Sequence, residues 1–236
     1  MAYWSVRLPE ELREVTSVDE AFAAIVNAAR EVGFDSCAYG YQHPLPFSRS
    51  EIFLLNNYAK DWRERYDDAQ YLGVDPTVIR ARASIEPIVW SNKLFRGAAQ
   101  LWDEARSFGL RHGWAQSCFS PDGGVGLLSL ARGDEPLSEL ELRVKDIELR
   151  WLVNVAHGAL SPWAVSISKR RSRKLTRREI EVLRWAGDGK TADETGRIIS
   201  RSRFTVDFHF KNAMRKLGVR TRTAALARAA AMGLLR

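Results

Sequence analysis

The part of the sequence that decides the fold reads, from residue 175 to residue 218, LTRREIEVLRWAGDGKTADETGRIISRSRFTVDFHFKNAMRKLG. It contains T-R-R-E from Thr176 and T-A-D-E from Thr191, two capping boxes typical of helix starts. Ser202 can cap a third helix. The short segment before Ser202 leaves room only for a tight turn between the second and third helices. This is the spacing of a helix-turn-helix, whose second helix enters a DNA major groove.

The third helix is predicted from about Arg203 to Leu217, ending at Gly218. Its buried side has apolar residues at steps of four, three and four: Val206, Phe210, Ala213 and Leu217. A fourth helix, from about Thr223 to Met232, is expected to pack behind it. The candidate DNA-binding residues are Thr191, Arg201, Arg203, Thr205, Asp207, Lys211, Asn212 and Arg215. The alternative is a small helical bundle with a solvated charged face.

Charge differs strongly between the two parts of the chain. Residues 169–236 contain 19 Lys and Arg against 6 Asp and Glu, a net charge of +13, whereas residues 1–168 contain 17 against 23, a net charge of −6. The most basic run, K-R-R-S-R-K at residues 169–174, lies where a linker is expected. This asymmetry predicts a basic module for a polyanion on an acidic body. Near DNA, basic contacts would add salt-dependent affinity without reading sequence.

Five short motifs carry a family resemblance: L-T-R-R-E-I-E-V-L from residue 175, G-K-T from 189, T-V from 205, F-H from 208 and N-A-M-R-K-L-G from 212. They resemble the LuxR-type DNA-binding domain and cover about the last quarter of the chain. Arg203 and Phe204 depart from its usual Glu-Arg, Thr195 from isoleucine and Asp207 from asparagine. Asp207 would be repelled by phosphates unless it accepts a hydrogen bond from a cytosine amino group, and Thr195 would put a hydroxyl into the core.

Composition argues against several classes of protein. No apolar run approaches the roughly 20 residues of a membrane span, and the first residues have no signal-peptide core. Cys37 and Cys118 lack metal-ligand spacing and fit the core of a protein in a reducing cytoplasm. The histidines lie near no plausible nucleophile or carboxylate pair, and no glycine-rich phosphate loop is present. We therefore expect a cytoplasmic protein that is not an enzyme, with no metal, no cofactor and no membrane partner.

The first 160 residues alternate short helices and strands. Ser17 starts a helix that ends at Gly33, and Asp75 caps another. Further helices are predicted at 58–67, 98–108 and 139–160, the last with apolar residues on two sides, and strands at 36–41, 51–55, 87–90, 115–119 and 125–131. The predicted fold class is α+β: an N-terminal α/β/α sandwich around an antiparallel sheet, plus a C-terminal four-helix helix-turn-helix domain.

Aromatic residues near one aspartate suggest a ligand pocket. Tyr58, Trp62 and Tyr66 recur at steps of four, so they project from one helical face. Asp75 and Trp90 follow closely. Buried carboxylates need donated hydrogen bonds, and buried indole and phenol groups seek partners. One acceptor, a few neutral donors and apolar walls suit a small amphipathic ligand with an amide and carbonyls. The alternative is an ordinary core in which Asp75 is only a helix cap.

Six further motifs carry a second resemblance: N-Y from residue 57, W-R-E-R-Y from 62, V-D-P-T-V from 74, V-W from 89, G-L-R-H-G from 109 and G-L-L-S-L-A-R from 126. They look like the acyl-homoserine-lactone-binding domain of quorum-sensing LuxR-type receptors. That resemblance implies that Trp62 donates to the lactone carbonyl and Asp75 accepts the amide N–H, while Tyr58 and Ser129 hold the acyl carbonyl. The implied ligand-binding residues are Tyr58, Trp62, Tyr66, Asp75, Val78, Trp90, Leu110, Gly113, Leu127 and Ser129.

The two resemblances together imply a ligand-responsive transcriptional regulator. Residues 1–165 would bind an N-acyl-homoserine lactone and dimerise, residues 166–174 would form a basic linker, and residues 175–236 would bind DNA. The partners implied are a double-stranded, two-fold-symmetric DNA operator, RNA polymerase and a second copy of the chain. The two copies would contact one another through helix 139–160 and the C-terminal helix. The alternatives are an orphan receptor for another lactone or small molecule, and an antagonist that forms heterodimers with related regulators.

Overall fold

The computed structural model describes residues 3–46, 51–121, 123–169 and 174–235. The chain divides into two compact units. The first comprises Met1–Gln42, Ile52–Ser120 and Val125–Ala164, and the second comprises His43–Glu51, Pro121–Gly124 and Val165–Arg236. Of the basic run at 169–174, residues 170–173 lie outside the described part of the chain.

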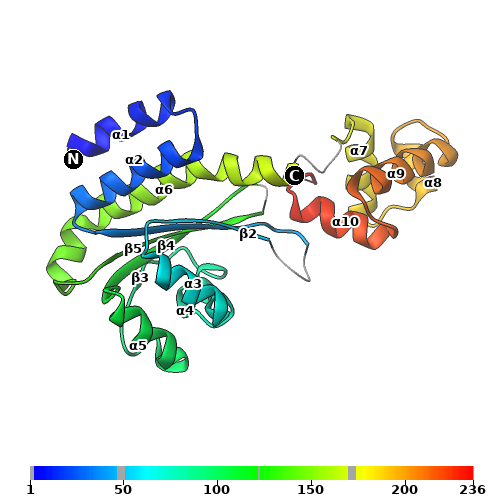
Figure 1. Cartoon of the computed structure of the whole chain (residues 1–236). Coiled ribbons are helices and arrows are strands. Elements are labelled where there is room, and N and C mark those ends of the chain that lie inside the picture. The colour runs from blue at the N-terminus through cyan, green and yellow to red at the C-terminus, as the bar shows by residue number, and fades with distance from the viewer. Residues whose placement is uncertain (1–2, 47–50, 122, 170–173, 236) are drawn as a thin grey trace. The chain divides into compact units, whose positions relative to one another are not determined.

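The first unit is built on a five-stranded antiparallel sheet with the strand order β2-β1-β5-β4-β3. Helices α1, α2 and α6 cover one face of the sheet, and α3, α4 and α5 cover the other (Figure 1). This arrangement confirms the predicted α/β/α sandwich. The strands are β1 (Ser36–Gln42), β2 (Ile52–Asn56), β3 (Ile88–Val89), β4 (His112–Phe119) and β5 (Val125–Arg132).

Local signals determine where several helices begin and end. Ser17 and Glu20 form the predicted capping box of α2, and Gly33 ends that helix with a φ of 101°. Asp75 caps α4, accepting a hydrogen bond from the Thr77 backbone N–H. The bounds are α2 (Val18–Val32), α3 (Lys60–Asp68), α4 (Pro76–Ala81) and α5 (Ala99–Ser107), with short 3-10 helices η1 (Tyr71–Gly73) and η2 (Arg96–Ala98).

One helix, α1 (Tyr3–Glu14), is not predicted by the sequence. It contains Pro9, which disfavours a helix interior. Packing stabilises it instead, because Trp4 and Leu8, one turn apart, are 2% and 1% exposed. The Trp4 ring also meets that of Trp151 in α6 edge-on, with 5.5 Å between centroids.

Helix α6 (Glu139–Lys169) is longer than the predicted 139–160 and contains Pro162. It buries one of its two apolar sides against the sheet, through Leu149, Leu152, Val153, Ala156 and Leu160. The other side stays exposed: Leu140, Val144 and Ile147 are each 72% accessible. The helix therefore carries an apolar stripe that the monomer does not use.

Arg132, at the end of β5, fixes the start of α6. Its guanidinium forms two hydrogen bonds with Glu141, at 2.9 and 2.6 Å, and one with the Gly33 carbonyl at 3.2 Å. Hydrogen bonds from Arg132 and Lys145 lower the pKa of Glu141 to about 2, because they outweigh the effect of burial, which would raise it. A strand, two helices and a loop thus meet at one ion-pair cluster.

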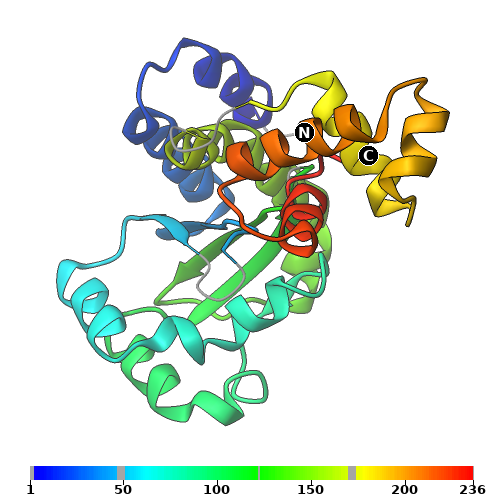
Figure 2. The same cartoon turned by 90° about the vertical axis from the view of Figure 1, so that its right-hand side faces the viewer.

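The second unit contains the four predicted C-terminal helices (Figure 1 and Figure 2). They are α7 (Arg177–Gly187), α8 (Ala192–Ile198), α9 (Arg203–Leu217) and α10 (Arg222–Ala231). Both Thr-x-x-Glu capping boxes form, and Ser202 caps α9. The core buries the predicted stripe of α9 against α7 and α10, and Thr195 is 1% exposed, as expected from its position.

An ion pair that the sequence does not reveal joins α7 to α9. Glu179, 4% exposed, closes the capping box with Thr176 and also accepts a hydrogen bond from Lys216 at 2.8 Å. Burial opposes the charged form, but the hydrogen bonds from Lys216 and Thr176 outweigh it and lower the pKa of Glu179. The capping glutamate therefore also stabilises the packing of two helices.

Candidate functional site

A cavity of about 530 Å³ lies between the sheet and the layer formed by α3, α4 and α5. Nine of the ten predicted ligand-binding residues line it: Tyr58, Trp62, Tyr66, Asp75, Val78, Trp90, Leu110, Leu127 and Ser129. Its volume falls in the range typical of small-molecule sites. The aromatic and carboxylate residues predicted to share a pocket are thus brought together.

Alternate side chains of three strands form the floor of the cavity. In a strand, every second residue points to the same face, so Tyr39 and Tyr41 of β1 are buried on the opposite face. The central residues Ala38 and Gly40 are small and leave space above the middle strand. The three rows, each running across β2, β1 and β5, are Asn56–Ala38–Ser129, Leu54–Gly40–Leu127 and Ile52–Gln42–Val125.

The rows change in polarity along the strands. The first carries the Asn56 amide and the Ser129 hydroxyl, and the second is entirely apolar. Gln42, in the third row, accepts a hydrogen bond from Arg82 Nε at 2.8 Å. Successive rows are two residues apart, so the three rows span about 13 Å. The first two rows therefore suit a molecule with a polar end followed by an apolar chain.

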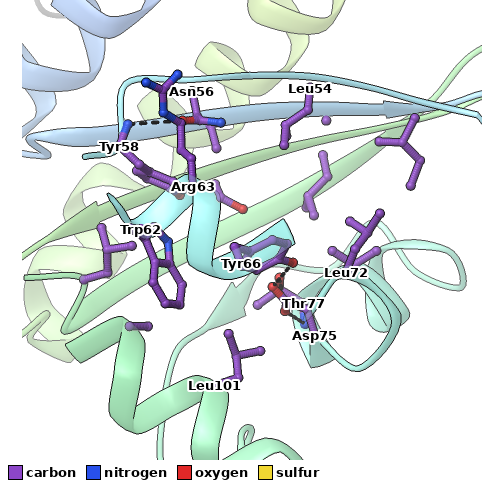
Figure 3. Close-up of a pocket in the computed structure, with 18 of the residues that line it drawn as sticks. Leu54, Asn56, Tyr58, Trp62, Arg63, Tyr66, Leu72, Asp75, Thr77 and Leu101 are labelled. Carbon is purple, nitrogen blue, oxygen red and sulfur yellow. Dashed lines mark hydrogen bonds between the residues drawn. The ribbon is translucent and has the colours of Figure 1, made fainter. Parts of the chain in front are cut away.

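Asp75 is the centre of a hydrogen-bonded group at the cavity wall (Figure 3). One carboxylate oxygen accepts from the Thr77 backbone N–H at 2.8 Å and from the Thr77 hydroxyl at 2.6 Å. The other accepts from the Tyr66 hydroxyl at 3.0 Å. Burial raises the pKa of Asp75, although the hydrogen bonds from Thr77 and Tyr66 act in the opposite direction. Asp75 is therefore both a helix cap and part of the cavity wall.

Trp62 and Tyr66 project from α3 toward the cavity, as their spacing predicts (Figure 3). The predicted start of this helix at Tyr58 is wrong, because α3 begins at Lys60 and Tyr58 reaches the cavity from the segment before it. Trp62 is 3% exposed and packs edge-on against Tyr66, with 5.8 Å between ring centroids. Burial raises the pKa of both Tyr58 and Tyr66, and the nearby Asp75 carboxylate raises it further. Both phenols therefore stay neutral and can donate hydrogen bonds.

Gly113 is the predicted residue that does not line the cavity. It lies on β4 under the Trp90 indole, and a Cβ atom there would come within 2.1 Å of the ring. Trp90 also donates its backbone N–H to the Gly113 carbonyl at 2.8 Å. Its buried indole N–H has no hydrogen-bond partner in the part of the chain that the structure describes. Gly113 thus shapes the cavity indirectly, by letting Trp90 lie flat against β4.

Several lining residues escape prediction from the sequence. They come from the strands and from the helices behind them, and include Ala38, Gly40, Gln42, Ile52, Leu54, Asn56, Leu72, Arg82, Phe95 and Leu101. The available signal was the alternation of small and polar residues with buried aromatics along β1. That signal places residues on one face of a strand but does not give the register with β2 and β5.

The candidate DNA-binding residues lie at the N-terminal cap of α8, in the turn between α8 and α9, and on α9. Gly196 of α8 packs on that turn, and a Cβ atom there would lie 2.6 Å from the Arg201 carbonyl oxygen. Ser200 turns the chain with a φ of 54°. Thr191, Arg201, Arg203, Lys211 and Arg215 are exposed, and Thr205, Asp207 and Asn212 are partly buried.

Asp207 has protein partners that the sequence did not indicate. Arg222 of α10 forms a short ion pair with it, and Arg203 Nε lies 3.7 Å from its carboxylate. Arg203 also pairs with Asp193 of α8 at 3.3 Å. These arginines offset the negative charge of Asp207.

Comparison with known proteins assigns both units. Residues 17–160 match the family model described as autoinducer binding domain, and residues 173–229 match bacterial regulatory proteins, luxR family. The chain belongs to the LuxR family of transcriptional regulators. Within the described residues, this LuxR-family protein has no helix long and apolar enough to cross a membrane.

Relatives of this LuxR-family protein match over its whole length. The transcriptional activator protein AnoR of Acinetobacter nosocomialis is 38% identical, with 100% of both chains covered. The quorum-sensing regulator RhlR of Pseudomonas aeruginosa is 34% identical, covering 98% of this chain and 96% of RhlR. The crystal structure of Escherichia coli SdiA superposes with a TM-score of 0.85 at 30% identity, covering 99% and 98% of the two chains. SdiA has also been solved in complex with octanoyl-rac-glycerol. These relatives are regulators rather than enzymes, which confirms the predicted family and the prediction of a regulator rather than an enzyme.

Proposed function

We propose that this chain binds an N-acyl-homoserine lactone in the cavity and then, as a dimer, binds a two-fold-symmetric operator. The observation that carries the ligand proposal is that polar groups and an apolar row of side chains follow one another within one cavity. Asp75, Tyr58 and Ser129 line the same space as Leu54 and Leu127. An amide with neighbouring carbonyls suits the polar groups, and an acyl chain suits the apolar row.

Each polar group then has a partner of complementary chemistry. The Asp75 carboxylate accepts the ligand amide N–H, and as a charged acceptor it does so more strongly than the neutral hydroxyl groups of the wall. The Trp62 indole N–H donates to the lactone carbonyl, and the Tyr58 and Ser129 hydroxyl groups donate to the acyl carbonyl. Tyr66 holds Asp75 in place through the 3.0 Å hydrogen bond.

Dimerisation is supported by the exposed stripe on α6. Leu140, Val144 and Ile147 recur at steps of four and three, so they lie on one side of the helix. Exposed apolar patches of this kind mark interfaces. Two copies related by a two-fold axis would present two α9 helices to successive half-sites of an operator.

DNA binding is supported by the fold and charge of the C-terminal residues. Arg201, Lys211 and Arg215 are exposed on or beside α9, the second helix of the helix-turn-helix. The net charge of +13 over residues 169–236 favours a polyanion. Contact with RNA polymerase in the cytoplasm follows from a role as a regulator of transcription.

A paired binding experiment tests the proposal. The purified chain is titrated with lactones of short to long acyl chain, and the complex is then tested for selective enrichment of duplexes from a random DNA pool. We expect one class of chain length to bind and the complex to enrich a two-fold-symmetric sequence. Tight lactone binding without any DNA binding would instead favour an antagonist that forms heterodimers.

A non-lactone acyl ligand is the second candidate. SdiA, with its TM-score of 0.85, has been solved with octanoyl-rac-glycerol, which pairs an acyl chain with a polar head that has no amide. Such a ligand would leave Asp75 without an amide N–H to accept. Binding of a monoacylglycerol that exceeds that of every lactone would favour this candidate.

A further inference from the structure

The outward face of α9 carries two exposed aromatic rings. Phe204 is 81% exposed and Phe208 is 56% exposed. They are four residues apart, so they lie on the same side of the helix. At about 100° per residue, this side is turned roughly 190° from the buried stripe of the helix. These rings therefore take no part in the core of the domain.

Two basic residues continue the same face. Lys211 and Arg215 lie within roughly 40° of the two rings around the helix axis, at about 100° per residue, and both are exposed. Phe204, Phe208, Lys211 and Arg215 thus form one strip along α9, with the rings in its N-terminal half and the cations in its C-terminal half. Two neighbouring exposed rings form a small apolar patch, and the cations beside it favour an anionic partner over another protein's apolar surface.

Double-stranded DNA offers one apolar group to such a strip. The N-terminal residues of a recognition helix contact base edges in the major groove. The thymine C5-methyl group is the apolar feature of those edges, and phenylalanine is among the side chains that contact it. A phenyl ring has no polar group to match a base edge, so Phe204 gains most where a methyl group is present.

Resting on the proposed DNA binding, we propose that Phe204 and Phe208 select operator sequence by packing against thymine methyl groups, while Lys211 and Arg215 hold the phosphates. Asp207, on the flank of the strip, is held by Arg203 and Arg222 and so does not oppose this approach. The rings thus determine which bases are chosen, and the cations determine how tightly any DNA is bound.

The test uses full-length protein purified with a mixture of lactones of short to long acyl chain. Duplexes are first selected from a random pool, and the best duplex is remade with uracil in place of each thymine in turn. Uracil removes the methyl group and keeps the base pair. We expect wild-type affinity to fall about fourfold at each contacted thymine, corresponding to about 0.8 kcal/mol.

Variants assign the effect to the rings. Phe204→Ala and Phe208→Ala should bind the thymine duplex as weakly as wild type binds the matching uracil duplex, and should no longer distinguish the two. Phe119→Ala, which removes a 47% exposed ring in the other unit, should distinguish them as wild type does. Lys211→Ala should weaken binding to both duplexes equally and lower the salt dependence by about one unit of slope.

Two outcomes would overturn the proposal in distinguishable ways. Sequence-specific binding that ignores uracil at every thymine, or is unchanged in both phenylalanine variants, would overturn the role of the rings alone and indicate a protein partner for them. Failure of the folded wild-type chain to enrich any DNA sequence would overturn the proposed DNA binding and this inference together.

Discussion

Replacing Asp75 by asparagine separates the two roles that the structure gives this residue. Asn caps helices about as well as Asp, so its carbonyl oxygen can keep both hydrogen bonds from Thr77. The side-chain NH2 group then replaces the oxygen that faces Tyr66, and it can only donate. The Tyr66 hydroxyl can turn to accept, whereas an amide N–H of the ligand cannot.

The structure gives a magnitude for each effect. A hydrogen bond to a charged group contributes about 1.5–3 kcal/mol, so Asp75→Asn should raise the lactone Kd roughly 10- to 150-fold at about 1.4 kcal/mol per tenfold. Stability without ligand should change by less than about 1 kcal/mol, because the cap is kept. Asp75→Ala should lose the same affinity and also about 1 kcal/mol of stability, because it loses the cap.

Calorimetric titration and thermal melting measure these two quantities separately. Glu104→Gln is a matched control: this carboxylate is hydrogen-bonded by Arg65 at 2.6 and 2.8 Å and does not line the cavity. Its lactone affinity should equal that of wild type. If Asp75→Asn also binds lactone with the wild-type Kd, Asp75 is only a helix cap and the assigned acceptor role is wrong.

Three further predictions concern packing and charge. Gly113→Ala should displace the Trp90 ring, since the new Cβ would lie 2.1 Å from it, and should cost about 1–3 kcal/mol in a denaturant titration. The pKa of Glu141 falls from 4.5 to about 2 on folding, so its ionised form stabilises the fold by at most about 3 kcal/mol. This stabilisation is present above pH 4.5 and is lost as the pH falls toward 2. In Glu141→Gln, the free energy of unfolding should depend less on pH across this range, as measured by unfolding curves. Lys216→Met should leave the buried Glu179 carboxylate unpaired and destabilise the C-terminal unit by about 3 kcal/mol, with part recovered by Glu179→Gln in the double variant; equal melting of the single variant and wild type would contradict the role of this ion pair.

Features encoded within a few residues could be predicted from the sequence. Caps at Ser17, Thr176, Thr191 and Ser202 form as expected because donor and acceptor are three residues apart. Helix α9 has the predicted bounds for the same reason. The aromatic and acidic wall of the cavity could likewise be grouped, because its members follow one another on neighbouring elements.

Features that depend on distant partners could not be predicted. The cavity floor needs the register that places Ala38 between Asn56 and Ser129, which no local pattern gives. The partner of Asp207 is Arg222, fifteen residues away across a turn. For α6, both apolar sides have the right period, and only the position of the sheet decides which is buried.

Hydrophobic side chains are exposed in this structure for different reasons. Leu54 is 46% exposed because it faces the cavity, and Leu140 is 72% exposed on the outer side of α6. Phe204, which replaces a common family residue, is more exposed than either. The structure gives each of these three exposed residues a different proposed partner: ligand, second chain and DNA.

The measurement that tests the central claim most directly is thermal melting of the full chain with a panel of lactones of short to long acyl chain, in parallel for wild type and Asp75→Asn. A lactone at 100 times its Kd stabilises the folded state by about 2.7 kcal/mol, which raises Tm by about 5–10 °C for a chain of this size. We predict that shift for one class of chain length in wild type, and a much smaller one for Asp75→Asn. A folded wild-type chain that shows no shift with any lactone would contradict the assignment of the cavity as a lactone site.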